Sequence, residues 1–210
     1  MFSTFANRMA QMLSLFLHPL LIPTLLFSLM ATFRIDVLTP FNAENIYFLI
    51  VFVFIGTFLA PVLIISLLYF SKSISSLMLD EKMDRQKAMV ASLLIYIGMA
   101  WMLYHHMKLN NFALWVFIEI VATMAVAIII TLFWKISLHS MGAAGLAMFC
   151  AFLAQKGFGN DIFYVFIGSI LLGGILLSAR LFLEKHTLAQ IVAGYGLGIF
   201  VGGIGFFVNN

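Results

Sequence analysis

Thirteen residues near the end of the chain, Ser178 to Gln190, place charged and titratable side chains between two long apolar runs. An ionisable group at the centre of a bilayer costs about 2.5–3.5 kcal/mol on insertion scales, so such groups often mark sites that water reaches. Arg180 and His186 therefore indicate a water-accessible site, and a guanidinium there suits chemistry on an anion. If the chain is helical from His186 onward, Gln190 lies one turn further on the same face, within reach of a hydrogen bond.

The composition predicts elements that cross a membrane. Of 210 residues, 64% are hydrophobic and only 9% are charged, whereas charged residues make up about 25% of an ordinary soluble domain. The apolar runs are long enough to cross a hydrocarbon core of about 30 Å, and they do not alternate as barrel strands would. We therefore expect an all-α polytopic membrane bundle. The net charge of +3 is small, and the basic residues lie in short loops beside the spans, so nothing indicates a nucleic-acid partner.

Seven spans are predicted, at residues 13–33, 47–70, 88–106, 112–134, 141–155, 162–177 and 187–208. A short amphipathic lead, residues 1–12, precedes the first span. Pro19 and Pro23 should bend or break that span, because proline removes a backbone donor, and His18 beside them is interpreted as structural. The third and fourth spans should form a helical hairpin. Glycine recurs every four residues along one face of the last span, at Gly194, Gly198 and Gly202, where another backbone can approach closely.

Counting the crossings brings three polar stretches to the same side of the membrane. They are residues 72–87, 135–139 and 179–187, whereas the loop at 156–161 falls on the other side. The positive-inside rule would make the first side cytoplasmic. Several of its basic residues are also candidate ligands, however, and these cannot serve as topology signals. Both orientations stay open at this point.

Residues in these stretches are suited to phosphoryl transfer. The transferred group carries negative charge on its oxygens, so a site for it needs fixed cations, backbone donors and an in-line nucleophile. Arg180 offers a planar fork that fits phosphate, and Ser137 lies where a helix N-terminus can present its amides. Lys135 and either Lys82 or Arg85 can add further charge. Together these residues form a predicted phosphate cradle.

The same stretches resemble the motifs of the membrane branch of the phosphatidic acid phosphatase and haloperoxidase superfamily. Its third motif is Ser-Arg, five residues, His, three residues and Asp, and Arg180, His186 and Gln190 have the same spacing. Its second motif, Pro-Ser-Gly-His, looks like Ile136-Ser137-Leu138-His139. Its first motif is Lys, six residues and Arg-Pro. The stretch Lys82 to Lys87 is similar, with a shorter interval and no proline.

The resemblance covers residues 47–208, which would form a six-span lipid-phosphatase-like core, and leaves residues 1–46 as an N-terminal addition. It implies hydrolysis of a lipid phosphate or diphosphate, such as phosphatidate or a polyprenyl diphosphate, in a bacterial inner membrane. By resemblance, His186 attacks phosphorus and forms a phosphohistidine. His139 protonates the leaving oxygen and later helps water to hydrolyse the intermediate. The resemblance implies no metal or other cofactor, and the sequence indicates no oligomeric state.

Gln190 departs from the family pattern, which has Asp at this position. An amide oxygen can accept a hydrogen bond from the imidazole but brings no charge, and the amide could instead turn its NH₂ toward the ring. In a protease triad, the change from Asp to Asn lowers turnover about 10⁴-fold. The alternative function is therefore a catalytically weak or inactive relative that binds or transports a phosphorylated lipid.

Other interpretations of single residues also stay open. Arg180 and His186 could be interfacial side chains, with Arg180 reaching the lipid headgroups. The charged stretch at 82–87 and Lys135 could simply be solvated and set the topology. Glu119, well inside the fourth span, could be held by hydrogen bonds or could lie on a proton or substrate path.

Overall fold

Helices make up nearly all the regular structure of residues 2–155 and 160–208, the part of the chain described by this computed structural model. Their bounds are α1 Phe2–Phe16, α2 Ile22–Phe33, α3 Ile46–Phe54, α4 Ala60–Phe70, α5 Lys82–His105, α6 Asn111–Phe133, α7 Leu138–Gln155, α8 Asn160–Phe182 and α9 Leu188–Val208. Short turns occur at η1 Pro19–Leu21, η2 Ile35–Leu38 and the π-helical η3 Ile55–Leu59. These ranges contain no strand, so the predicted all-α class is confirmed.

Seven segments of the described chain are long and apolar enough to cross a membrane. They are Phe5–Phe33, Ile46–Phe70, Lys82–His105, Asn111–Phe133, Leu138–Gln155, Asp161–Phe182 and Leu188–Gly205. Many large apolar side chains along them are exposed, for example Leu67, Phe133 and Phe200. Apolar surface on this scale is unfavourable in water and favourable in lipid. The chain is an integral, multi-pass membrane protein.

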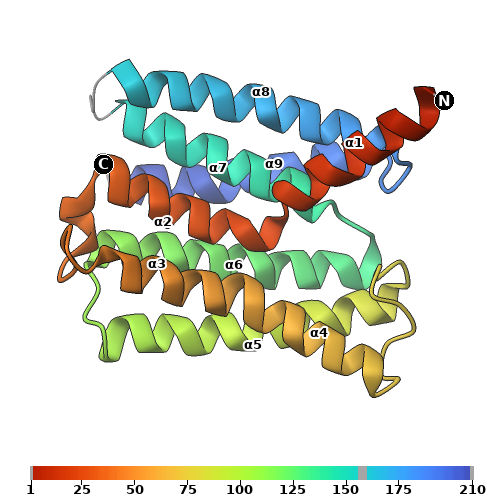
Figure 1. The fold of residues 1–210 in the computed structure, drawn as a ribbon, viewed down its shortest axis with the longest axis horizontal. Coiled ribbons are helices and arrows are strands. Elements are labelled where there is room, and N and C mark those ends of the chain that lie inside the picture. The colour runs from red at the N-terminus through yellow and green to blue at the C-terminus, as the bar shows by residue number, and fades with distance from the viewer. Residues whose placement is uncertain (1, 156–159, 209–210) are drawn as a thin grey trace. The chain divides into compact units, whose positions relative to one another are not determined.

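The helices group into two compact units. Unit 1 consists of Met1–Ile22 and Ile136–Asn210, and unit 2 consists of Pro23–Lys135. In unit 1, α7 packs along both α8 and α9, and α1 contacts α8 (Figure 1). In unit 2, α5 packs against α4 and forms the predicted hairpin with α6. The predicted boundary at residue 46 marks where the resemblance begins, and these units do not test it.

The first helix ends where the sequence predicts a break. α1 ends at Phe16, His18 has an extended backbone with φ −65° and ψ 136°, and η1 follows at Pro19. Proline has no N–H and restricts the residue before it to extended conformations, so α1 cannot continue. The lead predicted at residues 1–12 is not a separate element, because α1 runs without interruption from Phe2.

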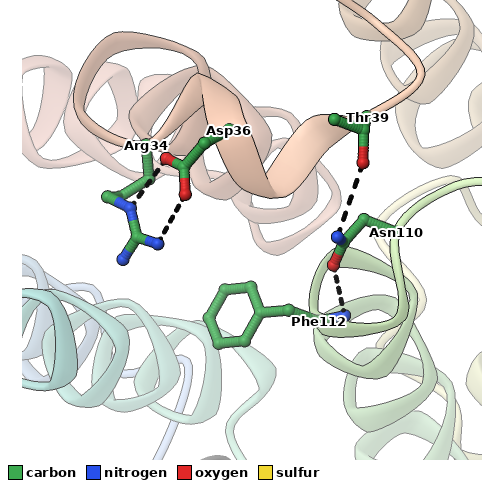
Figure 2. Close-up of polar contacts among 5 residues, drawn as sticks. All are labelled: Arg34, Asp36, Thr39, Asn110 and Phe112. Carbon is green, nitrogen blue, oxygen red and sulfur yellow. Dashed lines mark hydrogen bonds and ion pairs between the residues drawn. The ribbon is translucent and has the colours of Figure 1, made fainter.

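Polar contacts, both local and to the start of α6, hold the connection after α2 (Figure 2). The Arg34 guanidinium donates to both carboxylate oxygens of Asp36, at 2.8 and 2.6 Å. These hydrogen bonds hold the pKa of Asp36 below its ordinary value, but the carboxylate is largely exposed, so the pair adds little stability. Asn110 accepts from the N–H of Phe112 at 2.8 Å, which caps α6, and its amide donates to Thr39 Oγ1 at 3.4 Å.

The span predicted at residues 47–70 is one continuous helical segment that contains a π-helical turn, η3, which the sequence pattern does not predict. Pro61 follows this turn and has no N–H, so it cannot donate to the preceding turn as other helical residues do. The carbonyl of Thr57, four residues earlier, accepts a hydrogen bond from the Tyr96 hydroxyl at 2.8 Å. Both side chains are buried in unit 2, at 0% and 1% exposure.

Three polar stretches predicted as loops are partly helical, which corrects the span limits. α5 begins at Lys82 rather than residue 88, α7 at Leu138 rather than residue 141, and α8 continues to Phe182 rather than ending at residue 177. Four candidate site residues that were expected in loops therefore lie on helices: Lys82, Arg85, His139 and Arg180. A helix can extend past the apolar run because long polar side chains reach water from its last turns. The loop predicted at 156–161 lies mostly outside the described residues.

Candidate active site

The starts of α7 and α9 meet in unit 1. The backbone N–H of Ser137 donates to the carbonyl of Gln190 at 3.3 Å. The helices can approach this closely because a Cβ at Gly194 would collide with the Ser137 carbonyl and the Ser140 hydroxyl. Cβ atoms at Gly198 and Gly202 would likewise press on α7, which confirms the predicted bare face of α9. The second and third polar stretches are therefore brought together.

Gln190 holds the imidazole of His186 while it caps α9. Its Oε1 accepts from the backbone N–H of Thr187 at 3.2 Å, and the Thr187 hydroxyl accepts from the N–H of Gln190 at 3.4 Å. This reciprocal Thr-x-x-Gln arrangement is a capping box. His186 Nδ1 lies 3.1 Å from the same Oε1. The predicted hydrogen bond is present, although it comes from the cap and not from a helical face, because α9 begins only at Leu188.

The cap also fixes which end of the Gln190 amide faces the ring. A backbone N–H only donates, so the atom that accepts from Thr187 is the amide oxygen. The same oxygen accepts from His186 Nδ1–H, which leaves the lone pair of the neutral ring on Nε2. The opposite amide orientation would lose the bond from Thr187. Gln190 therefore selects a tautomer of His186 without supplying charge.

His139 is tied to the end of α1. Its Nε2 lies 3.1 Å from the carbonyl oxygen of Ser14, and a carbonyl only accepts, so the ring donates Nε2–H. The last carbonyls of a helix have no donor within the helix, and Pro19 prevents α1 from supplying one by continuing. His139 thus caps α1, and its neutral ring carries the lone pair on Nδ1. Nothing in the sequence pattern indicates this partner.

His18 and Arg180 complete a basic cluster in unit 1. The His18 ring meets that of His139 edge to face, with centroids 5.5 Å apart and planes at 81°. Its Nδ1 accepts from the backbone N–H of Leu20 at 3.3 Å. Arg180, in the last turn of α8, is close enough for its charge to interact with both rings, and His186 interacts with His139 in the same way. Four basic side chains thus converge from separate segments.

The members of this cluster differ in exposure. His18, His139 and Arg180 are half-buried, whereas His186 is only 8% exposed. Ser137, beside the cluster, is 0% exposed. The Ser137 hydroxyl lies 3.4 Å from the backbone N–H of Ser140, as an N-cap of α7. Its predicted contact with phosphate stays a prediction. No group of three His, Cys, Asp or Glu side chains within the described ranges could hold a metal ion.

The remaining predicted cations belong to unit 2. Lys82 is exposed in the first turn of α5, Arg85 is 8% exposed, and Lys135 is half-buried after the end of α6. Gln86 Nε2 donates to the carbonyl of Thr131 at 3.2 Å, so the start of α5 lies beside the end of α6. The first polar stretch and Lys135 are therefore at the same end of the α5–α6 hairpin.

Two other charged residues of this stretch hold the connection between α4 and α5. The Asp84 carboxylate accepts from the backbone N–H and the hydroxyl of Ser75, both at 2.6 Å. Lys87 Nζ donates to the carbonyl of Ser73, also at 2.6 Å. Their charges fix the backbone of the connection, which favours a structural role for these two residues.

Glu119 is half-buried on α6 and accepts a hydrogen bond from Trp115 Nε1 at 3.2 Å. Its own carbonyl accepts from the Thr123 hydroxyl at 2.6 Å. A partner one turn away on the same helix favours the hydrogen-bonded interpretation of this carboxyl over a place on a proton or substrate path.

In comparisons with models of known protein families, with curated proteins and with solved structures, nothing matched the chain. The fold defines its class as a polytopic helical membrane protein. Within that class, the distinguishing feature is the basic cluster of unit 1, with one imidazole held by a glutamine and another by a backbone carbonyl.

Proposed function

We propose that the chain is an integral membrane phosphatase that hydrolyses a lipid phosphate or diphosphate through a phosphohistidine on His186. The observation that carries the proposal is the hydrogen bonding of Gln190, which keeps the proton of the neutral His186 ring on Nδ1 and the lone pair on Nε2. An imidazole attacks phosphorus through an unprotonated nitrogen. The spacing of Arg180, His186 and Gln190, which resembles a lipid phosphatase motif, supports the same chemistry.

The charges in unit 1 suit an anionic substrate. Its acidic residues are Asp161 and Glu184 alone. Arg180 can hold two phosphoryl oxygens with parallel N–H donors, which a lysine cannot do. Because Arg180 and His186 both interact electrostatically with His139, a phosphoryl group bound among them would meet the cation, the nucleophile and a second imidazole together.

In the proposed reaction, His186 Nε2 attacks phosphorus and the bond from phosphorus to the lipid oxygen breaks. The proton of the bound phosphate monoanion passes to Nδ1 of His139, whose Nε2–H stays with the carbonyl of Ser14, and the leaving oxygen takes that proton from Nδ1. Nδ1 then accepts a proton from water as that water attacks phosphorus and breaks the nitrogen–phosphorus bond. The proton on Nδ1 leaves with the phosphate, and His139 and His186 both return to their neutral forms. The Ser14 carbonyl would orient the His139 ring in both steps.

Phosphate release by the purified full chain tests this proposal. We expect turnover of at least one lipid among phosphatidate, phosphatidylglycerol phosphate, a polyprenyl diphosphate and a lipid A phosphate. His186→Ala should lower the rate at least about 10³-fold, because no other group replaces the nucleophile. His105→Ala is the control, since His105 is exposed at the end of α5 in unit 2. No turnover of any lipid, or full activity of His186→Ala, would contradict the proposal.

A second candidate function is binding or transport of a phosphorylated lipid without hydrolysis. It is favoured by Gln190, which holds the ring but brings no charge to stabilise a positive His186. Gln190→Glu separates the two functions, because glutamate keeps the Oε1 acceptor and adds a negative charge. A weak phosphatase should gain about tenfold or more in turnover, given the size of the corresponding loss in a protease triad. Lipid binding without turnover in both forms would support the second function.

A further inference from the structure

The N-terminal segment belongs to the same compact unit as the candidate active site. Unit 1 joins Met1–Ile22 to the helices α7, α8 and α9. Two contacts fasten the segment there: the Ser14 carbonyl accepts from His139, and the ring of His18 lies against that of His139. A segment that the resemblance treats as an addition therefore contacts a proposed catalytic imidazole.

The backbone determines the protonation pattern of His18. Its Nδ1 accepts from the N–H of Leu20 at 3.3 Å, and a backbone N–H cannot accept in return, so the neutral ring carries its proton on Nε2. Protonating Nδ1 would turn two N–H groups toward each other and cost the bond to Leu20. His18 is thus suited to donate a hydrogen bond through Nε2 and poorly suited to exchange protons.

The position of this donor suits an oxyanion. His18 is only partly buried, and its ring centroid lies 5.5 Å from that of His139. The charge of Arg180 also interacts with His18. A tetrahedral oxyanion held by Arg180 next to His139 has several oxygens to satisfy, and one guanidinium satisfies at most two of them.

We propose that His18 binds the phosphoryl group of the substrate by donating Nε2–H to one of its oxygens. The N-terminal segment would then be part of the active site. This inference rests on the proposed function for the identity of the ligand, which is the phosphoryl group that a lipid phosphate and free phosphate share.

Two substitutions separate binding by His18 from its structural role. His18→Asn places an amide oxygen where Nδ1 lies, so it keeps the acceptor for Leu20 N–H and removes the outer donor. His18→Gln does the reverse, because its terminal NH₂ can reach the place of Nε2 while the cap is lost. Binding of inorganic phosphate, and in a second arm of a short-chain phosphatidate, is measured by calorimetry on the full chain in detergent, with the melting temperature recorded for each variant.

We expect His18→Asn to weaken binding of both ligands about tenfold or more at an unchanged melting temperature, as loss of a hydrogen bond to a charged group predicts. His18→Gln should stay within about threefold of the original affinity and melt at a lower temperature.

Tighter binding of phosphatidate than of phosphate would identify the source as a lipid headgroup, and the reverse order would identify free phosphate. Unchanged affinity in His18→Asn, equal losses in both variants, or no binding by the original chain would overturn the inference.

Hydrolysis of the lipid panel on the same preparations distinguishes this inference from the proposed function. If phosphate binding depends on His18 but no lipid is hydrolysed, the proposed phosphatase activity is wrong and the proposed anion site at His18 is supported. If lipids are hydrolysed but His18→Asn binds phosphate as the original chain does, His18 is not a phosphate ligand and the proposed phosphatase activity is supported.

Discussion

Gln190 serves two purposes that a carboxylate could also serve: it closes the first turn of α9 and it holds His186. The capping role requires only an acceptor for the N–H of Thr187, which an amide oxygen supplies as well as a carboxylate does. The proposed catalytic role differs, because a charged partner would stabilise the positive ring that the proposed bond from Nε2 to phosphorus would create. Glutamine therefore preserves the geometry, and in the proposed reaction it would give a lower rate than a carboxylate.

At this scale the hydrogen bonds predict the tautomer of each ring. His186 should carry its proton on Nδ1, whereas His18 and His139 should carry theirs on Nε2, because each faces a backbone group or an amide oxygen of fixed polarity. Nitrogen NMR of the histidine-labelled protein near neutral pH distinguishes the two forms. Gln190→Leu should release His186 into a mixture of tautomers and leave the other two rings unchanged. An Nε2–H signal for His186 in the original chain would refute the assignment.

At the scale of elements, the close contact of α7 and α9 positions the cluster. Gly194→Ala should destabilise the protein by about 1–3 kcal/mol, because its Cβ would press on the backbone of Ser137 and on Ser140. Gly196→Ala, on the same helix with open space at its Cβ, should be neutral or stabilise by up to about 1 kcal/mol. Unfolding in mixed micelles measures both changes. Equal effects of the two substitutions would show that the close approach is not present.

The π-helical turn before Pro61 makes a second prediction for an element. Tyr96→Phe removes the donor to the Thr57 carbonyl and should destabilise unit 2 by about 0.6–2 kcal/mol, the range for interhelical hydrogen bonds in membranes and buried unsatisfied groups. Tyr104→Phe is the matched control, because Tyr104 is 54% exposed on the same helix. The melting temperature of the two variants checks this. A change as small as that of the control would rule out a stabilising role for the Tyr96 hydroxyl.

The elements also show how far sequence carries the fold and the site. Long apolar runs predict all seven crossing segments, because length and hydropathy alone decide whether a helix can span a bilayer. The helical turns that contain Lys82 and Arg180 were expected to be loops, because the apolar pattern ends before them. Thr187-x-x-Gln190 was readable as a capping box. The bond from His139 to Ser14 was not, because 125 residues separate them and only packing brings them together.

At the scale of the whole molecule, the order of crossings predicts the sidedness of the loops. Seven spans place the connections at Lys72 and Glu184 on one side of the membrane and the connection at Lys108 on the other. Single cysteines at these exposed positions, in a chain with the buried Cys150 replaced by Ala, can be labelled by an impermeant thiol reagent in oriented cells. We expect Lys72→Cys and Glu184→Cys to label from the same side and Lys108→Cys from the opposite side. Labelling of all three from one side would contradict the seven-span topology.

The chain passes between its two units twice, between Ile22 and Pro23 and between Lys135 and Ile136. Unit 1 holds the proposed nucleophile, its orienting glutamine, the second imidazole and the guanidinium, so the core of the proposed chemistry lies within one unit. The other predicted cations, Lys82, Arg85 and Lys135, belong to the second unit. Their role as phosphate ligands stays a prediction.

Trapping the covalent intermediate tests the central claim most directly. The full chain is mixed with a lipid phosphate labelled on phosphorus, stopped in alkaline detergent that preserves phosphohistidine, and digested for mass spectrometry. We predict label on His186 Nε2, absent from His186→Ala and present in His105→Ala. Phosphate release without label on His186, or label on any other residue, would contradict the account.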